Sequence, residues 1–434
     1  MARASVALPG ERRLPTKQLL AWLAGIVSLS LIVFLSSRLA VQFYTTPTPH
    51  HLVLEQDIPL PGPFPPPPGQ SPLAPGRAER FDHFDFQALD PNTHLLFIAH
   101  TGPSPDREVL INHNFNPDTD SKTDGNVLVF DTIQHKLLRV LPIPQVAGVA
   151  AAPDLGRVYA ADANDSIIYA IDEHTFQLTQ IKLDPFDGPD AIEYDPVDHK
   201  IFVSDPGAPP NPDSSMVTLL KNENVAVIDA LTNKLITWIP LGLDGKWGDD
   251  VGHTRYDPTS RLVYTVTLPL QDPDSPNLLP APPSYLAVID PVKNRLLKRI
   301  RLPDACLTPH GLFIDPRIEM AYIACIDSDP DPILVRVDLR TQKPVVEDYP
   351  TLGIKPDVLA MDFSRHLLFV GCATGVSIFQ EEGRALVKIG TFTIGANSHT
   401  VAVNQQTHEI YLPLFSVGGR PTLRIMTYNA NGVN

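Results

Sequence analysis

A sevenfold repeat constrains the fold of this chain more than any other feature of its sequence. Seven aromatic residues near the end of short apolar runs mark successive copies: Phe97, Tyr159, Phe202, Tyr264, Tyr322, Phe369 and Tyr411. Seven positions before each marker stands Asp90, Ala152, Asp195, Asp257, Asp315, Asp362 or Asn404, and four of the Asp residues precede Pro. Asp-Pro favours a turn, because Pro presets φ and the Asp side chain caps the turn. Each copy therefore begins as strand, tight turn, strand.

A second hairpin follows in most copies. Apolar runs ending in Asp occupy 126–131, 167–172, 224–229, 285–290 and 333–338, and a polar turn leads from these runs to a fourth apolar segment. Four antiparallel strands in a unit of roughly 40 to 60 residues are typical of a β-propeller blade. We therefore predict an all-β protein whose residues 52–430 form one seven-bladed β-propeller. The 46 prolines of the chain also argue against a mainly helical fold.

The last copy has no fourth strand before the chain ends, whereas residues 52–62 form an apolar segment that precedes the first copy. If this segment completes the seventh blade, the ring closes and no sheet edge stays open. We predict that 52–62 is the closing strand. The proline-rich stretch 63–80 that follows is expected to be an extended spacer.

The N-terminus differs from the rest of the chain. Leu19 to Leu35 contains no charge, and Arg3, Arg12, Arg13 and Lys17 precede it. The length and the charge bias predict a cytoplasmic basic segment (1–18), a transmembrane signal anchor (19–37) and a juxtamembrane linker (38–51). A cleaved signal peptide is the alternative, but Arg38 and Ala40 match a cleavage site before Val41 poorly. We therefore expect a single-pass protein of the cell membrane, anchored through this helix, with an extracytoplasmic propeller.

The charge of the outer part excludes one class of partner. The formal net charge is −15, and the first 50 residues hold five basic side chains and one acidic, so the remainder carries −19. A surface this acidic repels the phosphate backbone. Nucleic-acid binding is not expected.

The repeats resemble a known family. YAADANDSIIYAID (159–172) is similar to the repeat named for its Tyr-Val-Thr-Asn (YVTN) tetrad, found in bacterial extracytoplasmic seven-bladed propellers of the YncE-like type. No copy spells the tetrad; FVSD (202–205) and YTVT (264–267) are among the nearest. The resemblance implies the propeller fold over about residues 52–430. It does not imply an activity, because propellers host binding scaffolds, lactonases and dehydrogenases alike.

The repeat also places polar residues at one mouth of the central channel. Twelve positions before each marker, where the innermost strand begins, stand Asp85, Ala147, Asp190, Gly252 (followed by His253), His310, Asp357 and His399. Three positions after each marker stand His100, Asp162, Asp205, Thr267, Cys325, Cys372 and Leu414. Constant spacing predicts that these residues pair across a hairpin, Asp85 with His100 and His310 with Cys325. The candidate ligand-binding residues are Asp85, His100, Asp190, Asp205, His253, His310, Asp357 and His399.

Two interpretations of this ring compete. Asp and His are common ligands of divalent cations, and His310, Asp357 and His399 come from consecutive blades, so these three are the candidate metal ligands. Alternatively, the ring is a polar rim whose members are satisfied by backbone and trapped water. Insertions at 101–125, 206–223 and 268–284 are expected to cap the same mouth, where loops commonly hold binding determinants.

The predicted function is binding of a small ligand, a cation or a protein partner at the channel mouth. The alternative is a cation-dependent, lactonase-like hydrolase acting at the same ring. No catalytic residue is identified, because the chain contains no GxSxG, HExxH or Walker motif.

Cys306 and Cys325 both fall at the capped face of the fifth blade. Pairing of Cys325 with His310 would leave Cys306 four residues away, so free buried thiols are expected; a disulfide requires the chain to fold back.

Overall fold

The structure is a computed structural model of the full chain. It describes residues 50–60, 84–102, 125–163, 166–183, 188–205, 224–241, 249–269, 283–326, 331–345, 350–395, 399–418 and 420–433. These residues fall into two units, Val53–Tyr428 and a smaller one made of Met1–Leu52 and Asn429–Asn434.

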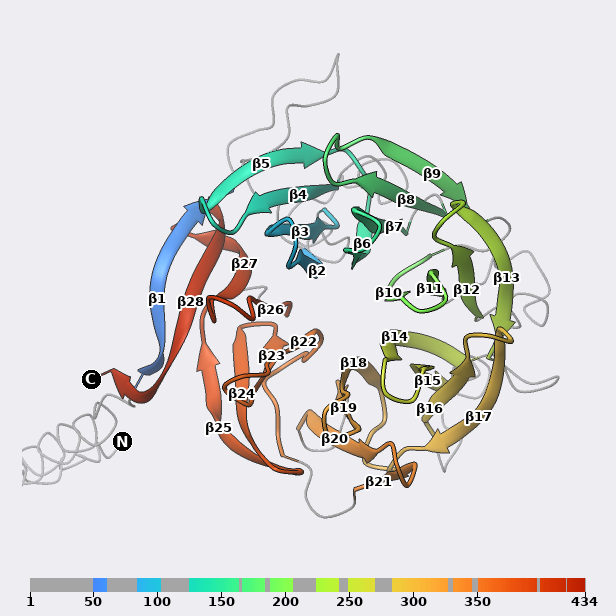
Figure 1. The fold of residues 1–434 in the computed structure, drawn as a ribbon. Coiled ribbons are helices and arrows are strands. Elements are labelled where there is room, and N and C mark those ends of the chain that lie inside the picture. The colour runs from blue at the N-terminus through green and yellow to red at the C-terminus, as the bar shows by residue number, and fades with distance from the viewer. Residues whose placement is uncertain are drawn as a thin grey trace, which may run out of the picture. The chain divides into compact units, whose positions relative to one another are not determined.

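The larger unit is a seven-bladed β-propeller, as predicted. Seven four-stranded antiparallel sheets surround a central axis (Figure 1). The first three blades consist of β2 (Phe84–Asp90), β3 (Leu95–His100), β4 (Asn126–Asp131) and β5 (Lys136–Leu141); β6 (Val146–Ala152), β7 (Arg157–Asp162), β8 (Ile167–Asp172) and β9 (Leu178–Lys182); and β10 (Ile192–Asp195), β11 (Lys200–Asp205), β12 (Asn224–Asp229) and β13 (Lys234–Pro240).

The next three blades follow the same order. They consist of β14 (Asp249–Asp257), β15 (Leu262–Pro269), β16 (Tyr285–Asp290) and β17 (Arg295–Arg301); β18 (Pro309–Asp315), β19 (Met320–Cys325), β20 (Ile333–Asp338) and β21 (Lys343–Pro344); and β22 (Leu359–Asp362), β23 (Leu367–Cys372), β24 (Gly375–Glu382) and β25 (Ala385–Thr393). The seventh blade combines β26 (Ala402–Val403), β27 (Ile410–Val417), β28 (Arg420–Val433) and β1 (His50–Pro59).

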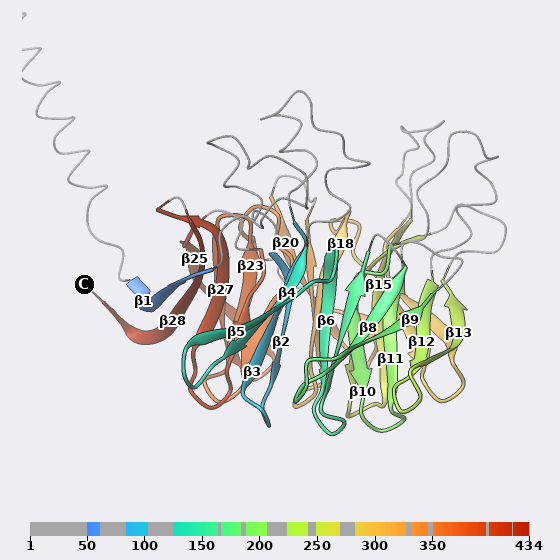
Figure 2. The same cartoon turned by 90° about the horizontal axis from the view of Figure 1, so that it is seen from above.

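The repeated Asp residues act as the sequence predicts. In the first blade, Asp90 Oδ1 accepts hydrogen bonds from the backbone N–H groups of Asn92 and Thr93 at 2.6 and 3.3 Å. His94 then takes a positive φ of 59° that closes the turn. The aromatic markers stand on the second strands and are fully or almost fully buried between blades. Figure 2 shows the turns that join β2 to β3 and β10 to β11 at one face of the ring.

The closing strand is confirmed, with bounds slightly different from 52–62. β1 is the outermost strand of the sheet ordered β1-β28-β27-β26, so the two ends of the chain complete one blade. The Arg424 guanidinium donates to both carboxylate oxygens of Asp57, at 2.8 and 2.7 Å. Leu60 is buried in an apolar cluster that also contains Phe84 and Tyr411, which ties the closing segment to the first and last blades.

Several predicted segments lie outside the described residues. These are the basic N-terminus 1–18, the candidate anchor 19–37, the linker up to residue 49, the spacer 63–80, and the insertions at 103–124, 206–223 and 270–282. Within the ranges that the structure describes, no helix is long and apolar enough to cross a membrane.

Cys306 and Cys325 form a disulfide, so the expectation of free thiols is wrong. Their Cα atoms lie 5.3 Å apart. A turn in which Cys306 N–H donates to the Pro303 carbonyl at 2.9 Å folds the chain back over the blade. Cys325 pairs with Pro309 rather than His310, which shortens the distance that the bridge must span.

Loss of β1 should destabilise the whole ring. A chain that begins at Arg80 loses the outer strand of the seventh blade and the buried Leu60, and it exposes β28 as an open edge. We expect it to melt about 10 °C or more below a chain that begins at Pro49, or to aggregate. Thermal unfolding followed by circular dichroism measures the difference; equal melting temperatures would show that β1 contributes nothing.

Candidate functional site at the channel mouth

The ring residues stand where the innermost strands begin. In the first, second, fourth and fifth blades a register shift interrupts the first hairpin at this point, for example between Phe84 and Gln87 and between Pro309 and Gly311. In the other three blades the strand begins after the ring residue. A bulge removes a residue from the ladder and re-aims its side chain.

The predicted hairpin pairs are therefore off by one position. His100 pairs with Phe84 instead of Asp85, and Cys325 pairs with Pro309 instead of His310. Constant spacing counts residues but does not reveal the extra residue of a bulge. The bulge leaves Asp85 and His310 outside the regular pairing.

Glycines bring the ring residues of neighbouring blades together. A Cβ added to Gly311 would lie 1.9 Å from the carbonyl oxygen of Asp357 in the next blade. The same holds for Gly148 against Asp190 (2.0 Å) and Gly252 against His310 (2.7 Å). Because real Cβ atoms do not approach other atoms this closely, only Gly permits the backbones to meet here.

Asp357 is the centre of the site. Its Oδ1 lies 2.9 Å from His253 Nε2 and 3.5 Å from His310 Nε2, and its Oδ2 lies 2.8 Å from His399 Nδ1. The side chains of Asp357 and His399 are 13% and 10% exposed, and that of His253 is fully buried. Three imidazoles from blades four, five and seven thus surround one carboxylate from blade six.

The hydrogen bonds of His253 determine which ring nitrogen carries its proton. The backbone N–H of Leu312 donates to Nδ1 at 3.3 Å, so Nδ1 is unprotonated. Burial lowers the pKa of His253 to about 4, although Asp357 acts in the opposite direction. A neutral His253 therefore carries its proton on Nε2, which lies 2.9 Å from Asp357 Oδ1.

The two carboxyl groups of the site differ in charge. Burial alone would raise the pKa of Asp357, but His310, His253 and His399 hold it well below the usual range. Burial, together with Asp190 and Asp357, raises the pKa of Asp85 well above its usual range. The site thus favours the ionised form of Asp357 and the protonated form of Asp85.

Two groups of side chains in the described structure are close enough to hold a metal ion, and they share Asp357. One contains His253, His310 and Asp357, and the other Asp85, Asp357 and His399; within each, the ligand atoms lie within 4.8 Å of one another. The candidate ligands His310 and His399 therefore fall in different groups. In the first group, the proton on His253 Nε2 occupies the lone-pair position that a metal needs. The second group is the candidate cation site, and Asp85 would release its proton when a cation binds.

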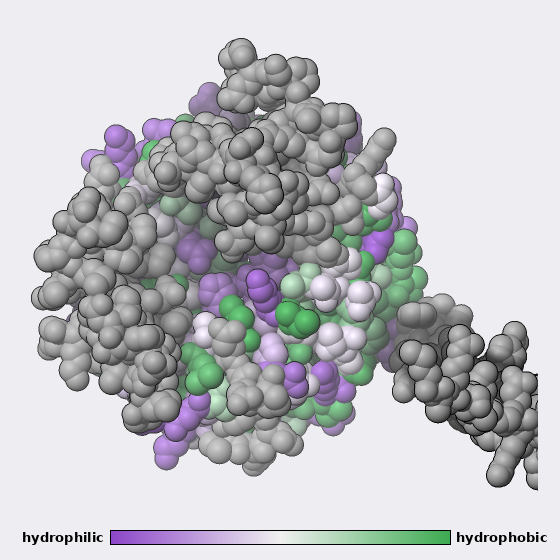
Figure 3. All heavy atoms as spheres, turned by 180° about the vertical axis from the view of Figure 1, so that it is seen from behind, coloured by the Kyte–Doolittle hydropathy of each residue, from purple (hydrophilic) through white to green (hydrophobic). Residues whose placement is uncertain are grey.

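The mouth of the channel is polar where it is visible. Figure 3 views the ring from behind Figure 1 and shows hydrophilic residues gathered around its centre. This face lies opposite the turns that contain Asp90 and its equivalents.

The other predicted ring residues have different surroundings. His100 is fully buried, and its Nδ1 accepts from Asn126 Nδ2 at 3.0 Å, which makes it part of the first blade's packing. Asp190 is close enough to Asp85 to raise the pKa of that group. Asp205 ends β11 opposite Asn224, and its side chain lies outside the described ones.

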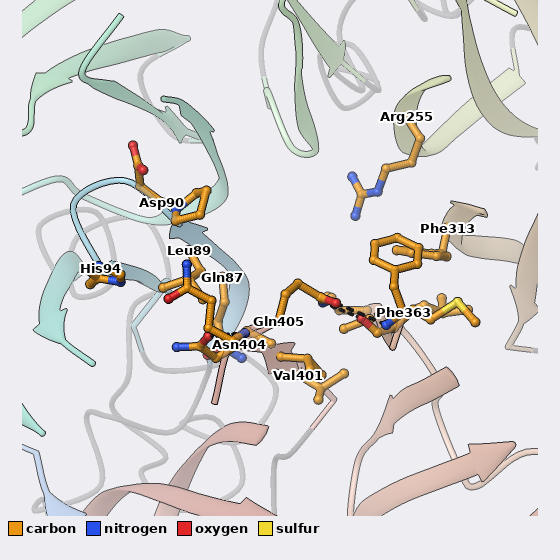
Figure 4. A pocket seen from close by; sticks show the side chains of 18 residues that line it. Gln87, Leu89, Asp90, His94, Arg255, Phe313, Phe363, Val401, Asn404 and Gln405 are labelled. Carbon is orange, nitrogen blue, oxygen red and sulfur yellow. Dashed lines mark hydrogen bonds between the residues drawn. The ribbon is translucent and has the colours of Figure 1, made fainter. Parts of the chain in front are cut away.

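Sequence reasoning missed a cavity further along the channel. It has a volume of about 380 Å³ and is lined by residues of five blades, among them Gln87, Arg255, Phe313 and Val401 (Figure 4). Arg255 lies 3.5 Å from the carboxylate of Glu193. The signal that could have revealed these residues is a second repeat position, nine residues before each aromatic marker, where Arg255 and Glu193 replace small residues.

Comparisons with known proteins support the fold only. No family model matches this chain, and the search of curated proteins found no match. Among solved structures it is similar to hydrazine synthase from Kuenenia stuttgartiensis, with a TM-score of 0.57 and 13% identity over 80% of this chain and 95% of that one. At this identity the likeness shows the seven-bladed propeller and no family.

Glu193 should make the stability of the propeller depend on pH. Burial raises its pKa to about 7, against the effect of Arg255, so ionised Glu193 costs stability as the pH rises from its unfolded pKa of about 4.3 toward 7. Glu193→Gln should unfold like the wild type near pH 4.5 and be more stable by on the order of 1 kcal/mol at pH 8. Urea unfolding at both values measures this, with the exposed Glu382→Gln as the control. An equal difference in unfolding free energy between the variant and the wild type at both pH values would contradict the raised pKa of Glu193.

Proposed function

We propose that this protein is a membrane-anchored, extracytoplasmic propeller that binds a divalent cation at the mouth of its channel through Asp85, Asp357 and His399. The observation that carries the proposal is the convergence of these side chains from blades one, six and seven within 4.8 Å of one another. Two carboxylates and an imidazole suit Zn²⁺ or Mn²⁺. Asp85 would release its proton when the cation binds, so that both carboxylates can act as ligands.

Two further features support the extracytoplasmic assignment. The resemblance of 159–172 to the YVTN repeat favours a YncE-like propeller, a type found outside the cytoplasm. The Cys306–Cys325 disulfide is of a kind that persists in oxidising compartments. The uncharged segment 19–35 with basic residues before it supports the anchor.

The geometry favours binding over the hydrolase alternative. A hydrolase at this ring would need a carboxylate free to act as a base. The two oxygens of Asp357 lie 2.8 and 2.9 Å from histidine nitrogens, and burial together with Asp190 and Asp357 raises the pKa of Asp85 well above its usual range. The ring is therefore better suited to hold a ligand than to move protons.

Paired histidine variants test the cation site. Calorimetric titration of the purified extracytoplasmic part with Zn²⁺ and with Mn²⁺ should show one site, and His399→Asn and Asp357→Asn should weaken it at least about tenfold. His310→Asn is the matched control, because His310 contacts Asp357 but is not one of the proposed ligands. This variant should keep the cation affinity of the wild type. Melting temperatures show whether each variant is folded.

Two outcomes would contradict cation binding by Asp85, Asp357 and His399. If His310→Asn abolishes binding while His399→Asn does not, the other group of side chains holds the cation. If the folded wild type binds neither ion and contains no metal by elemental analysis, the ring is a satisfied polar rim and the proposal fails.

The membrane topology has its own test. The charge bias around residues 19–35 predicts that alkaline phosphatase fused to the C-terminus is active and stays with the membrane fraction. An inactive fusion would place the propeller in the cytoplasm. An active fusion released from the membrane would show that the segment is a cleaved signal peptide.

A further inference from the structure

The register of the first hairpins identifies a repeat position inside the channel. The residue directly opposite each aromatic marker is Ala88, Ala150, Glu193, Arg255, Phe313, Ala360 or Ala402 in blades one to seven. Four of the seven are alanine, and the three large side chains come from consecutive blades. This asymmetry leaves space on one side of the channel and fills the other.

The cavity of about 380 Å³ lies in that space. Ala360 and Ala402 line it, and Arg255 extends toward it from the opposite side (Figure 4). The volume falls within the range of small-molecule sites in proteins.

Arg255 has hydrogen-bond donors to spare. Its Nη1 donates to the Thr254 carbonyl at 2.9 Å and lies 3.5 Å from Glu193 Oε2. Among the residues that the structure describes, none accepts a hydrogen bond from Nε or Nη2. The side chain is only 15% exposed, and the Phe86 ring lies 5.5 Å from the guanidinium carbon. A largely buried guanidinium whose N–H groups are only partly hydrogen-bonded is costly unless a ligand supplies the remaining acceptors.

We propose that the channel binds a small organic monocarboxylate, whose two oxygens accept hydrogen bonds from Nε and Nη2 of Arg255. The planar guanidinium matches a carboxylate in a two-point contact. A doubly charged phosphate suits the site less well, because Glu193 and the anionic Asp357 are both close enough to act on Arg255.

The rest of the cavity fits the organic part of such a ligand. Phe313 and Phe363 lie on one side with their ring centroids 6.0 Å apart, and Val358, Leu359 and Val401 add apolar surface. Gln405 is held in place, since its amide accepts from Phe363 N–H at 3.1 Å and donates to the Met361 carbonyl at 2.6 Å. The lining thus combines this apolar surface with polar groups from Gln87, Asp90, His94, Asn404 and Gln405, and Arg255 stands at its edge. This site is separate from the proposed cation site, so a negative result at one does not contradict the proposal for the other.

Matched probes test the proposal. Acetate, propionate, pyruvate and benzoate are titrated into the purified propeller by calorimetry, each beside its neutral amide. We expect at least one carboxylate to bind and its amide to bind at least about tenfold more weakly. Arg255→Gln should abolish this preference, whereas Glu193→Gln should strengthen carboxylate binding by removing the competing charge. Arg139→Gln, which removes an arginine placed 5.4 Å from the Phe176 ring on an outer strand, is the control and should change nothing.

A second variant guards against a folding defect in Arg255→Gln. Ala360→Leu fills the cavity but keeps the guanidinium, and it should also block carboxylate binding. The proposal is overturned if no carboxylate binds better than its amide, if phenyl phosphate binds more tightly than benzoate, or if the folded Arg255→Gln protein binds carboxylates as the wild type does.

Discussion

Neighbouring innermost strands approach so closely at the channel mouth that a Cβ cannot fit between them. Gly148, Gly252 and Gly311 each face a backbone carbonyl of the next blade, at Asp190, His310 and Asp357. β1 completes the last blade as its outermost strand, so all seven sheets around the axis have four strands. The polar side chains next to these glycines are forced into one small volume by the close approach of the strands. The chemistry of the site follows from this geometry.

Burial then decides the charge of each group. Three histidines lower the pKa of Asp357, whereas burial and the nearby Asp190 and Asp357 raise the pKa of Asp85. Further along the channel the sign reverses, since Arg255 lies there with Glu193 as its ion-pair partner at 3.5 Å. Glu193 has a pKa of about 7, so it neutralises Arg255 only in part at neutral pH. We therefore propose one position for a cation at the channel mouth and one for an anion inside the channel.

Much of this architecture could be predicted from the sequence. Aromatic markers at constant distances from Asp turns indicate blades, and the missing fourth strand of the last blade indicates closure by 52–62. The approach of His310 and His399 to Asp357 follows from the same counting, because equivalent residues of a closed ring lie at equal heights; His253 stands one position after the equivalent residue, Gly252. The spacing could not show the bulges, which shift Asp85 and His310 by one position from their expected partners. Nor could it show the turn at Pro303 that brings Cys306 to Cys325.

Two other features depend on contacts between distant residues. The proton position on His253 is set by the backbone N–H of Leu312, 59 residues away, and no local pattern contains this information. The hairpin register identifies Arg255 as a candidate site residue, because it stands where four other blades carry alanine. The positions that the seven copies share thus identify the propeller scaffold, and the positions at which the copies differ identify the candidate sites.

Anomalous diffraction from crystals of the propeller grown with Mn²⁺ tests the central claim most directly. We expect one strong anomalous peak at the channel mouth, within about 2.0 to 2.6 Å of a carboxylate oxygen from both Asp85 and Asp357 and of a ring nitrogen of His399. His253 should keep its hydrogen bond to Leu312. No peak at this position, with Asp357 still bonded to its histidines in the presence of Mn²⁺, would contradict it.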